Sequence, residues 1–272
     1  PMTIRIATAA LLAASLVSTP FAVAAAPAAA ASKAAPAPKA VKKYTIEQFF
    51  ATKRIGRASF SADESRLMYH SDESGIYNVY SVAVGGGKAE ALTTSTKDST
   101  FAVSYFPADN RILYTRDNGG DENNHLFVRE LDGKERDLTP GAKLKAAFLA
   151  WSPDGSAFYV TTNERDPKFF DLYRYDAKSY ERKVVFKNDK GLDVAAISRD
   201  EKWVALNKPN TTIDSDVYLY DVAKDEVRHL TPHTGSVKHG AQTFDPASKR
   251  LLFTSDEGGE FERIKAYDLA SG

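Results

Sequence analysis

The apolar and polar positions of this chain repeat with a period of about 46 residues. A four-residue anchor, which follows one apolar stretch and precedes another, begins at Phe60, Phe106, Trp151, Ile197 and Phe244. Subtracting successive positions gives spacings of 46, 45, 46 and 47 residues. A regular period between about 20 and 50 residues is typical of repeat architectures rather than of one irregular core. The pattern therefore predicts five copies of one structural unit, the last of them incomplete.

The third copy shows most clearly what one unit contains. Apolar residues predict strands at 146–151 and 157–161, with a Ser-Pro-Asp-Gly turn between them. A polar loop is expected at 162–168, before an alternating third strand at 171–175 and a fourth strand at 182–186. Four antiparallel strands in a repeat of this length make one propeller blade. We therefore predict an all-β chain, a β-propeller with four blades and most of a fifth.

The second strand of each copy favours this fold over other β folds. It is apolar at consecutive positions, as in Ile112-Leu113-Tyr114, so both of its faces need cover. Blades that pack face to face supply that cover. An immunoglobulin-like sandwich would show alternation in most strands and no long-range repeat. The Gly-His and Trp-Asp dipeptides of WD40 propellers are missing from the sequence.

Two short motifs recur where predicted strands end. Third strands close on Tyr175-Asp176, Tyr220-Asp221 and Tyr267-Asp268, and fourth strands on Leu138-Thr139-Pro140 and Leu230-Thr231-Pro232. An aspartate at the end of a strand commonly accepts hydrogen bonds from the backbone that follows it. We therefore interpret both motifs as structural rather than as a ring of ligand-binding groups, and we expect Trp151 and Trp203 in the core.

Composition excludes several classes of partner and chemistry. The chain has 36 Lys and Arg against 36 Asp and Glu, so its formal net charge is zero. Nucleic acids and anionic membranes reward clustered positive charge, and we expect neither as a partner. The absence of cysteine removes disulfides, zinc thiolates and a cysteine nucleophile together.

The N-terminal region reads as a targeting segment. Arg5, an apolar run at 6–17 and the small-residue cluster Ala22-Val23-Ala24 predict a signal peptide over 1–24. The Ala- and Pro-rich stretch 25–43 predicts a linker, and 44–272 is then the partial propeller. Export without cysteine suits a bacterial envelope, so we expect a periplasmic or secreted protein with no membrane contact after cleavage.

Several segments carry a resemblance to a known family. These are the lead-in 44–50, the stretch 71–78, the Gly-rich 85–88 ahead of Ala91-Leu92-Thr93, and above all Arg116-Asp117-Asn118-Gly119-Gly120-Asp121-Glu122-Asn123. With the anchors they resemble the PD40-type, TolB-like propeller of exported prolyl-oligopeptidase-family (S9) serine peptidases. In that family an α/β-hydrolase domain with a Ser-Asp-His triad follows the propeller. The resemblance implies a propeller that gates the access of short peptides to that domain.

The residues of this chain assign it no catalytic role of its own. A serine nucleophile elbow needs Gly-x-Ser-x-Gly, and no such pentapeptide occurs. The five histidines fall inside the repeats, with no nucleophile to serve. Peptide substrate is then expected only through a hydrolase domain absent from this chain. The alternatives are a non-enzymatic TolB-like propeller that binds a protein partner, and a propeller lyase or lactonase with a central metal, for which no ligand set is visible.

The acidic loop is the candidate for a binding role. Arg116, Asp117, Asp121, Glu122 and Asn123 are assigned to substrate gating, because loops on one face of a rigid ring commonly carry function. The loop lacks the spaced ligands of a calcium site. His229 and His233 have a spacing that suits a metal only on a helix, which Pro232 opposes. No metal and no cofactor is therefore expected.

The incomplete fifth copy leads to one further expectation. A propeller protects its strand edges by closing the ring. The fifth copy has no fourth strand before Gly272, so we expect exposed backbone donors and exposed apolar residues such as Leu251 and Phe253. Aggregation of the chain on its own would follow from that exposure.

Overall fold

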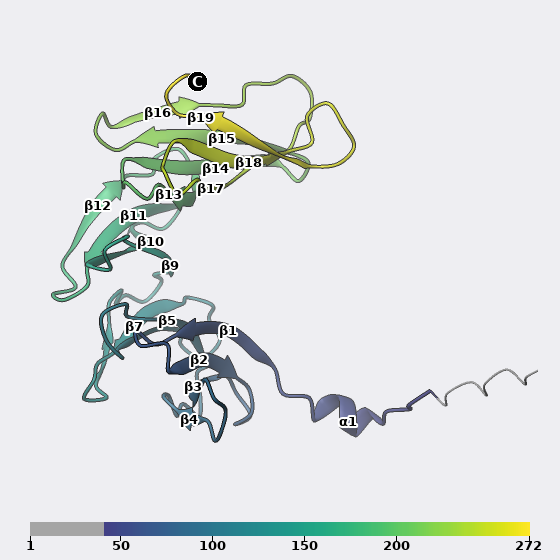
Figure 1. Ribbon diagram of the computed structural model, residues 1–272, viewed down its shortest axis with the longest axis vertical. Helices are drawn as coiled ribbons and strands as arrows, with labels where there is room; N and C mark the ends of the chain where they lie inside the picture. The colour runs from purple at the N-terminus through teal and green to yellow at the C-terminus, as the bar shows by residue number, and fades with distance from the viewer. Residues whose placement is uncertain (1–40) are drawn as a thin grey trace, which may run out of the picture. The chain divides into compact units, whose positions relative to one another are not determined.

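Figure 1 shows the computed structural model of the chain, in which residues 41–272 are described. The signal peptide predicted at 1–24, and the linker predicted at 25–43 except for its last three residues, lie outside the described residues. Over 41–272, none of the helical structure is long and apolar enough to cross a bilayer. The chain divides between Phe49 and Phe50 into two units, which are described separately.

Ahead of the blades, the described residues 41–54 contain the short helix α1 (Ile46–Phe50). Its N-terminus is a capping box. The Thr45 hydroxyl accepts a hydrogen bond from the Gln48 amide (3.3 Å), and the Gln48 side chain accepts one from the Thr45 amide (3.0 Å). The sequence pattern of 44–50 did not predict this helix.

The remainder of the described chain forms five antiparallel sheets, each built from strands in sequence order. The first sheet contains β1 (Ile55–Phe60), β2 (Arg66–Ser71), β3 (Asn78–Ala83) and β4 (Glu90–Ala91), and the second contains β5 (Thr100–Tyr105), β6 (Ile112–Arg116), β7 (His125–Arg129) and β8 (Glu135–Asp137). The third contains β9 (Ala146–Trp151), β10 (Ala157–Asp166), β11 (Phe169–Asp176) and β12 (Arg182–Phe186). The fourth contains β13 (Asp193–Ile197), β14 (Trp203–Thr211), β15 (Asp214–Asp221) and β16 (Glu226–His229), and the fifth contains β17 (His239–Phe244), β18 (Arg250–Ser255) and β19 (Arg263–Asp268). The predicted all-β propeller architecture is confirmed.

The central hairpins of the third and fourth sheets are longer than predicted. The polar residues 162–166, for which the sequence predicted a loop, belong to β10, and the corresponding residues 207–211 belong to β14. Polar side chains pair across these hairpins and prolong the ladder. Arg165 binds the fully buried Asp171 carboxylate through Nε (2.6 Å) and Nη2 (2.8 Å). Hydrophilic composition was therefore the wrong signal for the end of these strands.

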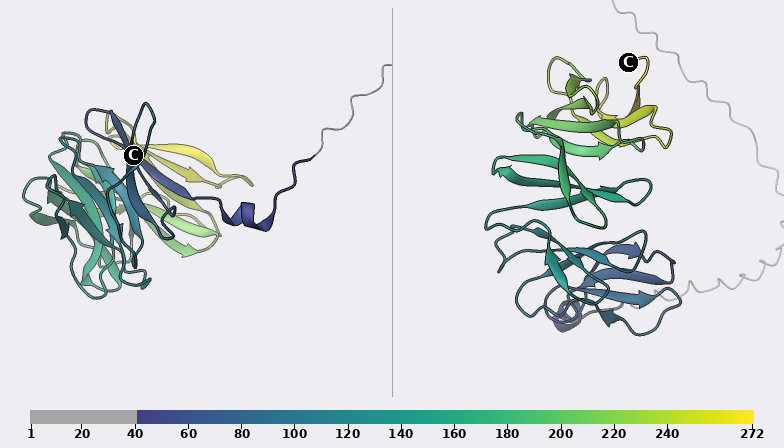
Figure 2. Two further views of the ribbon diagram at one scale, coloured as in Figure 1. Left: turned by 90° about the horizontal axis from the view of Figure 1, so that it is seen from below. Right: turned by 90° about the vertical axis from the view of Figure 1, so that its left-hand side faces the viewer.

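Each pair of neighbouring sheets encloses its own hydrophobic cluster, and Figure 2 shows the blades that contribute to them. The second strands are covered on both faces as predicted: Ile112, Leu113 and Tyr114 are at most 1% exposed. One expectation was wrong. Leu251 and Phe253 are buried against the fourth sheet, because they alternate onto the inner face of β18. The large exposed apolar side chains near the end of the fifth sheet are Phe261 and Ile264.

A β-bulge interrupts the first strand of every sheet at the same place. The residue that the pairing skips is Arg57, Val103, Leu149, Ala195 or Gln242 in successive sheets. Bulges bend a strand and re-aim its side chains. At the first of these positions the backbone of Arg57 is left-handed, with φ of 44°.

The two recurrent motifs have the structural roles that the sequence indicated. The aspartates of the Tyr-Asp pairs accept bonds from backbone amides two and three residues later, as at Asp176 (2.9 and 2.8 Å). In the Leu-Thr motif the threonine hydroxyl accepts the amide of a residue in the third strand. Three sheets share this bond, at 2.8–2.9 Å, from Val79 to Thr93, from Leu126 to Thr139 and from Val217 to Thr231.

The loops of the five sheets emerge on two faces, to which we give names. The connector face carries the hairpins between second and third strands (72–77, 117–124, 167–168, 212–213, 256–262) and the connections between sheets (92–99, 138–145, 187–192, 230–238). The turn face carries the turns between first and second strands and between third and fourth strands. Hydrogen bonds join loops within a face, such as Gly119 to Asp98 (2.7 Å) on the connector face and Ala177 to Ser156 (2.8 Å) on the turn face.

Candidate functional site

The acidic loop between β6 and β7 is held by its own carboxylates. Asp121 accepts hydrogen bonds from the amides of Asn123 (2.9 Å) and Asn118 (3.3 Å), and Asp117 accepts one from the amide of Glu122 (3.3 Å). These bonds, led by the one from the Asn123 amide, lower the pKa of Asp121. The two aspartates therefore shape the loop from within.

The other two ionisable members of the loop face different surroundings. The Arg116 guanidinium lies over the Phe127 ring (4.2 Å to its centroid) and pairs with Glu135 (3.4 Å), so its charge is balanced within its own sheet. Glu122 is exposed, has a left-handed backbone (φ of 59°), and makes no side-chain hydrogen bond or ion pair to the residues described. Of the predicted gating residues, Glu122 presents the free charge.

A cavity of about 380 Å³ lies directly beside this loop. Residues from the first three sheets line it, including Arg57, His70, Phe101, Thr115, Asn124 and Phe148. Thr115 and Asn124 flank the acidic loop in sequence, which places the cavity at the base of that loop.

The cavity offers both a hydrogen-bond donor and a hydrogen-bond acceptor that are unused. The Arg57 guanidinium has no carboxylate partner in the described part of the chain. The side-chain oxygen of Asn124 is buried and accepts no hydrogen bond there. Burial, followed by the nearby Arg57 charge, lowers the pKa of His70, whose Nδ1 accepts the Ala102 amide (3.2 Å). A guanidinium and a free carbonyl beside aromatic rings complement a peptide amide, which needs one partner of each kind.

Sequence reasoning missed this cavity. Arg57 reaches it because the first-strand bulge turns its side chain, and a bulge leaves no mark in the hydrophobic pattern. Asn124 directly follows the predicted gating residues, but its unpaired oxygen is visible only in three dimensions. The acidic loop was the one available signal, and it lies next to the cavity.

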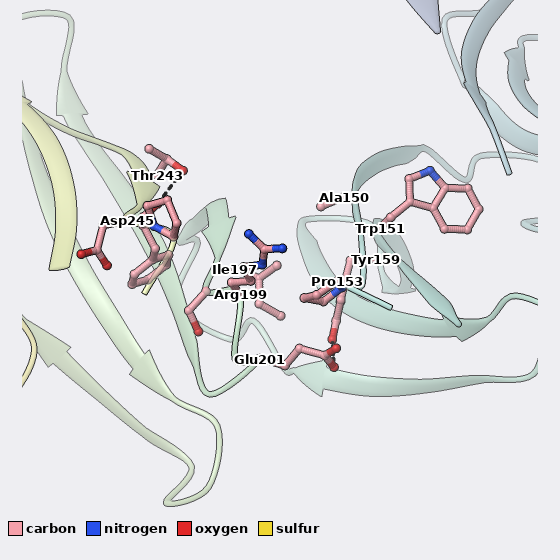
Figure 3. A pocket seen from close by; sticks show the side chains of 12 residues that line it. Ala150, Trp151, Pro153, Tyr159, Ile197, Arg199, Glu201, Thr243 and Asp245 are labelled. Carbon is pink, nitrogen blue, oxygen red and sulfur yellow. Dashed lines mark hydrogen bonds between the residues drawn. The ribbon is translucent and has the colours of Figure 1, made fainter. Parts of the chain in front are cut away.

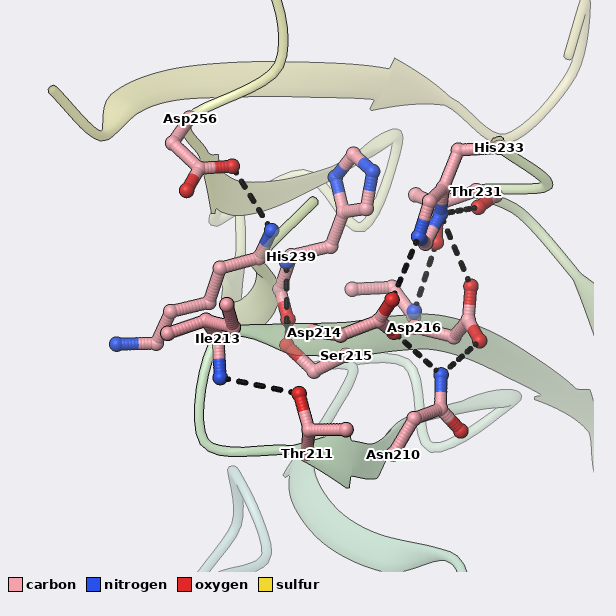
Figure 4. A network of polar contacts seen from close by, with 12 residues as sticks. Asn210, Thr211, Ile213, Asp214, Ser215, Asp216, Thr231, His233, His239 and Asp256 are labelled. Carbon is pink, nitrogen blue, oxygen red and sulfur yellow. Dashed lines mark hydrogen bonds and ion pairs between the residues drawn. The ribbon is translucent and has the colours of Figure 1, made fainter. Parts of the chain in front are cut away.

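A second group on the connector face joins the fourth and fifth sheets (Figure 4). Asp216 accepts hydrogen bonds from His229 (2.7 Å) and Asn210 (2.9 Å), and its carboxylate lies 3.4 Å from His233 Nδ1. The buried His239 ring lies 5.2 Å from that of His233, and neither of its nitrogens has a partner among the described residues. Over 41–272, no three His, Asp or Glu side chains are placed to hold a metal ion. Histidine–aspartate contacts therefore join the fourth sheet to the connection that follows it, and the His233 and His239 rings meet at the border with the fifth sheet.

A third site lies on the turn face, where the anchors of the third, fourth and fifth sheets meet. Its cavity has a volume of about 330 Å³, and Figure 3 shows the side chains around it. The lining includes Trp151, Tyr159, Arg199, Glu201, Phe244 and Asp245.

Comparisons with known proteins agree with this architecture. Residues 92–271 match the family model described as the prolyl oligopeptidase N-terminal β-propeller domain. The chain is 28% identical over 239 residues to dipeptidyl aminopeptidase BIII of Pseudoxanthomonas mexicana. The match covers 83% of this chain but only 33% of that protein. The chain thus spans about a third of the length of this curated relative.

Solved structures show the same fold at lower identity. A structure from a study of two prolyl endopeptidases matches with a TM-score of 0.62 and 17% identity, covering 81% of this chain and 35% of the other. An oligogalacturonate lyase in complex with manganese matches with a TM-score of 0.61 and 18% identity, covering 80% and 64%. Because proteins of such different names share this architecture, these likenesses establish the fold and leave the function to the residues of the site.

Proposed function

Because the chain belongs to the family of prolyl oligopeptidase N-terminal β-propeller domains, we propose that it gates the access of short peptides to a serine peptidase domain. The observation that carries this proposal is the connector-face cavity at the base of the acidic loop, with an unpaired guanidinium on its wall and the buried, unpaired amide oxygen of the lining residue Asn124 beside it. The relative named as a dipeptidyl aminopeptidase supports the choice of peptides as the substrate class.

The chemistry of the cavity defines how a peptide would be held. Arg57 donates to a peptide carbonyl, Asn124 accepts a peptide N–H, and Phe101 and Phe148 cover the side chains between them. Glu122 projects from the neighbouring loop and adds a negative charge that attracts a peptide N-terminus. Binding and orientation are the roles of these residues, and the acyl-transfer chemistry belongs to the hydrolase domain.

The test uses the full-length protein and peptides of increasing length that share one cleavable bond. Arg57→Gln and Glu122→Gln are expected to raise KM for the longer peptides severalfold and to leave kcat for the shortest peptide unchanged. Lys88→Gln, an exposed charge change on the turn face, is the matched control. If both site variants change KM equally for peptides of every length, or change it for none, the gating proposal is wrong.

Export is part of the same proposal. If residues 1–24 are a signal peptide, as their sequence predicts, the mature protein lies in the periplasm or outside the cell. N-terminal sequencing of protein isolated from the envelope should begin shortly after Ala24. A mature N-terminus that retains Met2 would contradict it.

A further inference from the structure

One anchor differs in charge from the other four. The third residue of the anchor is Ala62, Ala108, Pro153, Arg199 or Pro246 in successive copies. Four copies thus place a small or cyclic apolar residue where the fourth places a guanidinium. Because the copies share one backbone plan, the substitution puts a single positive charge at a turn position that is apolar in the other four copies.

Arg199 lines the turn-face cavity, and Figure 3 shows its guanidinium among the side chains of three sheets. The walls are largely apolar. Trp151 and Pro153 come from the third sheet, Ile197 from the fourth, and Phe244 and Pro246 from the fifth. The volume of about 330 Å³ accommodates a molecule of the size of one or two amino-acid residues.

The acidic residues of the cavity are already engaged by other partners. Glu201 accepts hydrogen bonds from the Tyr159 hydroxyl (2.5 Å) and from Arg174 (3.2 Å). Asp245 accepts the amides of Lys249 (2.7 Å) and Arg250 (3.0 Å) within its own turn, and its carboxylate lies 3.7 Å from the Arg250 guanidinium.

Arg199 itself makes no ion pair with any described residue. Each neighbouring carboxylate has an arginine of its own, so the charge left unbalanced in the cavity is the single positive charge of Arg199. A guanidinium is well suited to a carboxylate, which it can bind through two parallel hydrogen bonds.

We propose that the turn-face cavity binds an apolar monocarboxylate through Arg199. A dianion such as a phosphate monoester is disfavoured, because the one unbalanced positive charge of Arg199 leaves its second negative charge uncompensated. The aromatic and proline walls bind the apolar body of the ligand. The C-terminal residue of a peptide and a simple aryl or alkyl acid share this chemistry. The site is independent of the connector-face cavity, since its lining shares no residue with it.

Tryptophan fluorescence gives a direct measurement, because the chain has two tryptophans and one of them lines the cavity. In a Trp203→Phe background the signal reports on Trp151 alone. The full chain is titrated with N-acetyl-phenylalanine, with N-acetyl-phenylalaninamide and with 3-phenylpropionate. We expect saturable quenching by the first ligand and binding at least about tenfold weaker for the uncharged amide, since the bond to a charged group is lost.

The variants assign the binding to Arg199. Arg199→Gln should weaken the binding of N-acetyl-phenylalanine by about tenfold or more. Lys224→Gln removes a charge from the same sheet and face outside the cavity and should leave that binding unchanged. If 3-phenylpropionate binds as tightly as N-acetyl-phenylalanine, the ligand is a simple acid. If it binds more weakly, the ligand is the C-terminus of a peptide. Equal affinity for acid and amide, full binding by Arg199→Gln, or no saturable quenching at all would each overturn the proposal.

Discussion

Replacing Thr139 by valine isolates one hydrogen bond that holds a blade together. The Thr139 hydroxyl accepts the Leu126 amide at 2.9 Å, and both residues are fully buried. Valine keeps the shape of threonine and removes the acceptor, so the Leu126 N–H is left unpaired without access to water. The perturbation is therefore chemical rather than steric.

The expected magnitude follows from two opposing contributions. A buried amide without a partner costs about 1–3 kcal/mol. The methyl group that replaces the hydroxyl returns about 0.8 kcal/mol through apolar burial. With a cost of about 2 kcal/mol, the middle of that range, the net destabilisation of the second sheet is about 1.2 kcal/mol, and the opening equilibrium shifts by a factor of about 8.

Hydrogen exchange of the Leu126 amide is the appropriate assay, because repeat arrays can open one part at a time and a single melting temperature averages over them. Exchange at Leu126 should accelerate by that factor in Thr139→Val. Thr161→Val removes the same group from a solvent-exposed contact (3.5 Å to the Ala147 carbonyl) and should change stability by less than about 0.5 kcal/mol. Unchanged exchange at Leu126, or an equal effect of the control, would refute the reasoning.

Three further predictions concern pH and packing. Hydrogen bonds from Ser152 and Ser156, led by the Ser152 hydroxyl, hold the pKa of Asp154 at about 2. The stability that this gives is complete above pH 3.8 and is lost as pH falls towards 2. The urea midpoint of Asp154→Asn should therefore change less with pH across that window than the midpoint of the unmodified protein. Burial, then a neighbouring histidine, lowers the pKa of His239, so stability should decrease as pH falls below 6.5; a thermal melt of His239→Leu that keeps the same pH dependence would contradict this. A methyl group at Gly56 would overlap the His70 ring, so Gly56→Ala should lower the melting temperature by several degrees, while Gly85→Ala, with open space around it, should not.

The sequence predicts most of this fold because the fold is a repeat. Five recurrences of one pattern average out local ambiguity, and the first and fourth strands of the third sheet have the predicted bounds, 146–151 and 182–186. The errors arise where side chains pair across a hairpin. Residues 162–166 look like a loop by composition, yet the pair between Arg165 and the buried Asp171 extends the strand through them. Pairing of this kind depends on tertiary register, which propensity does not encode.

The candidate sites are harder to predict because each depends on a departure from the repeat. Arg57 is the one charged residue at the recurrent bulge position, and Asn124 matters because its oxygen lacks a partner. Arg199 could have been noticed by aligning the copies, since it is the one charged residue at its anchor position. The acidic loop 116–123 was recognised by resemblance, while the internal bonds of Asp117 and Asp121 appear only in the structure.

Each of the four hydrophobic clusters is shared by two adjacent sheets, so the stability of the domain is a sum of contributions from single sheets and from pairs of neighbours. Each sheet is stabilised by its own ladder and by one or two interfaces, so its free energy depends on the adjacent sheets and hardly on distant ones. Duplication or deletion of one copy of about 46 residues would preserve every other interface and create one new junction of the same kind. Blade number is thus a variable that recombination can change in whole steps, while a cavity lined by three consecutive sheets is kept only where those three copies stay together.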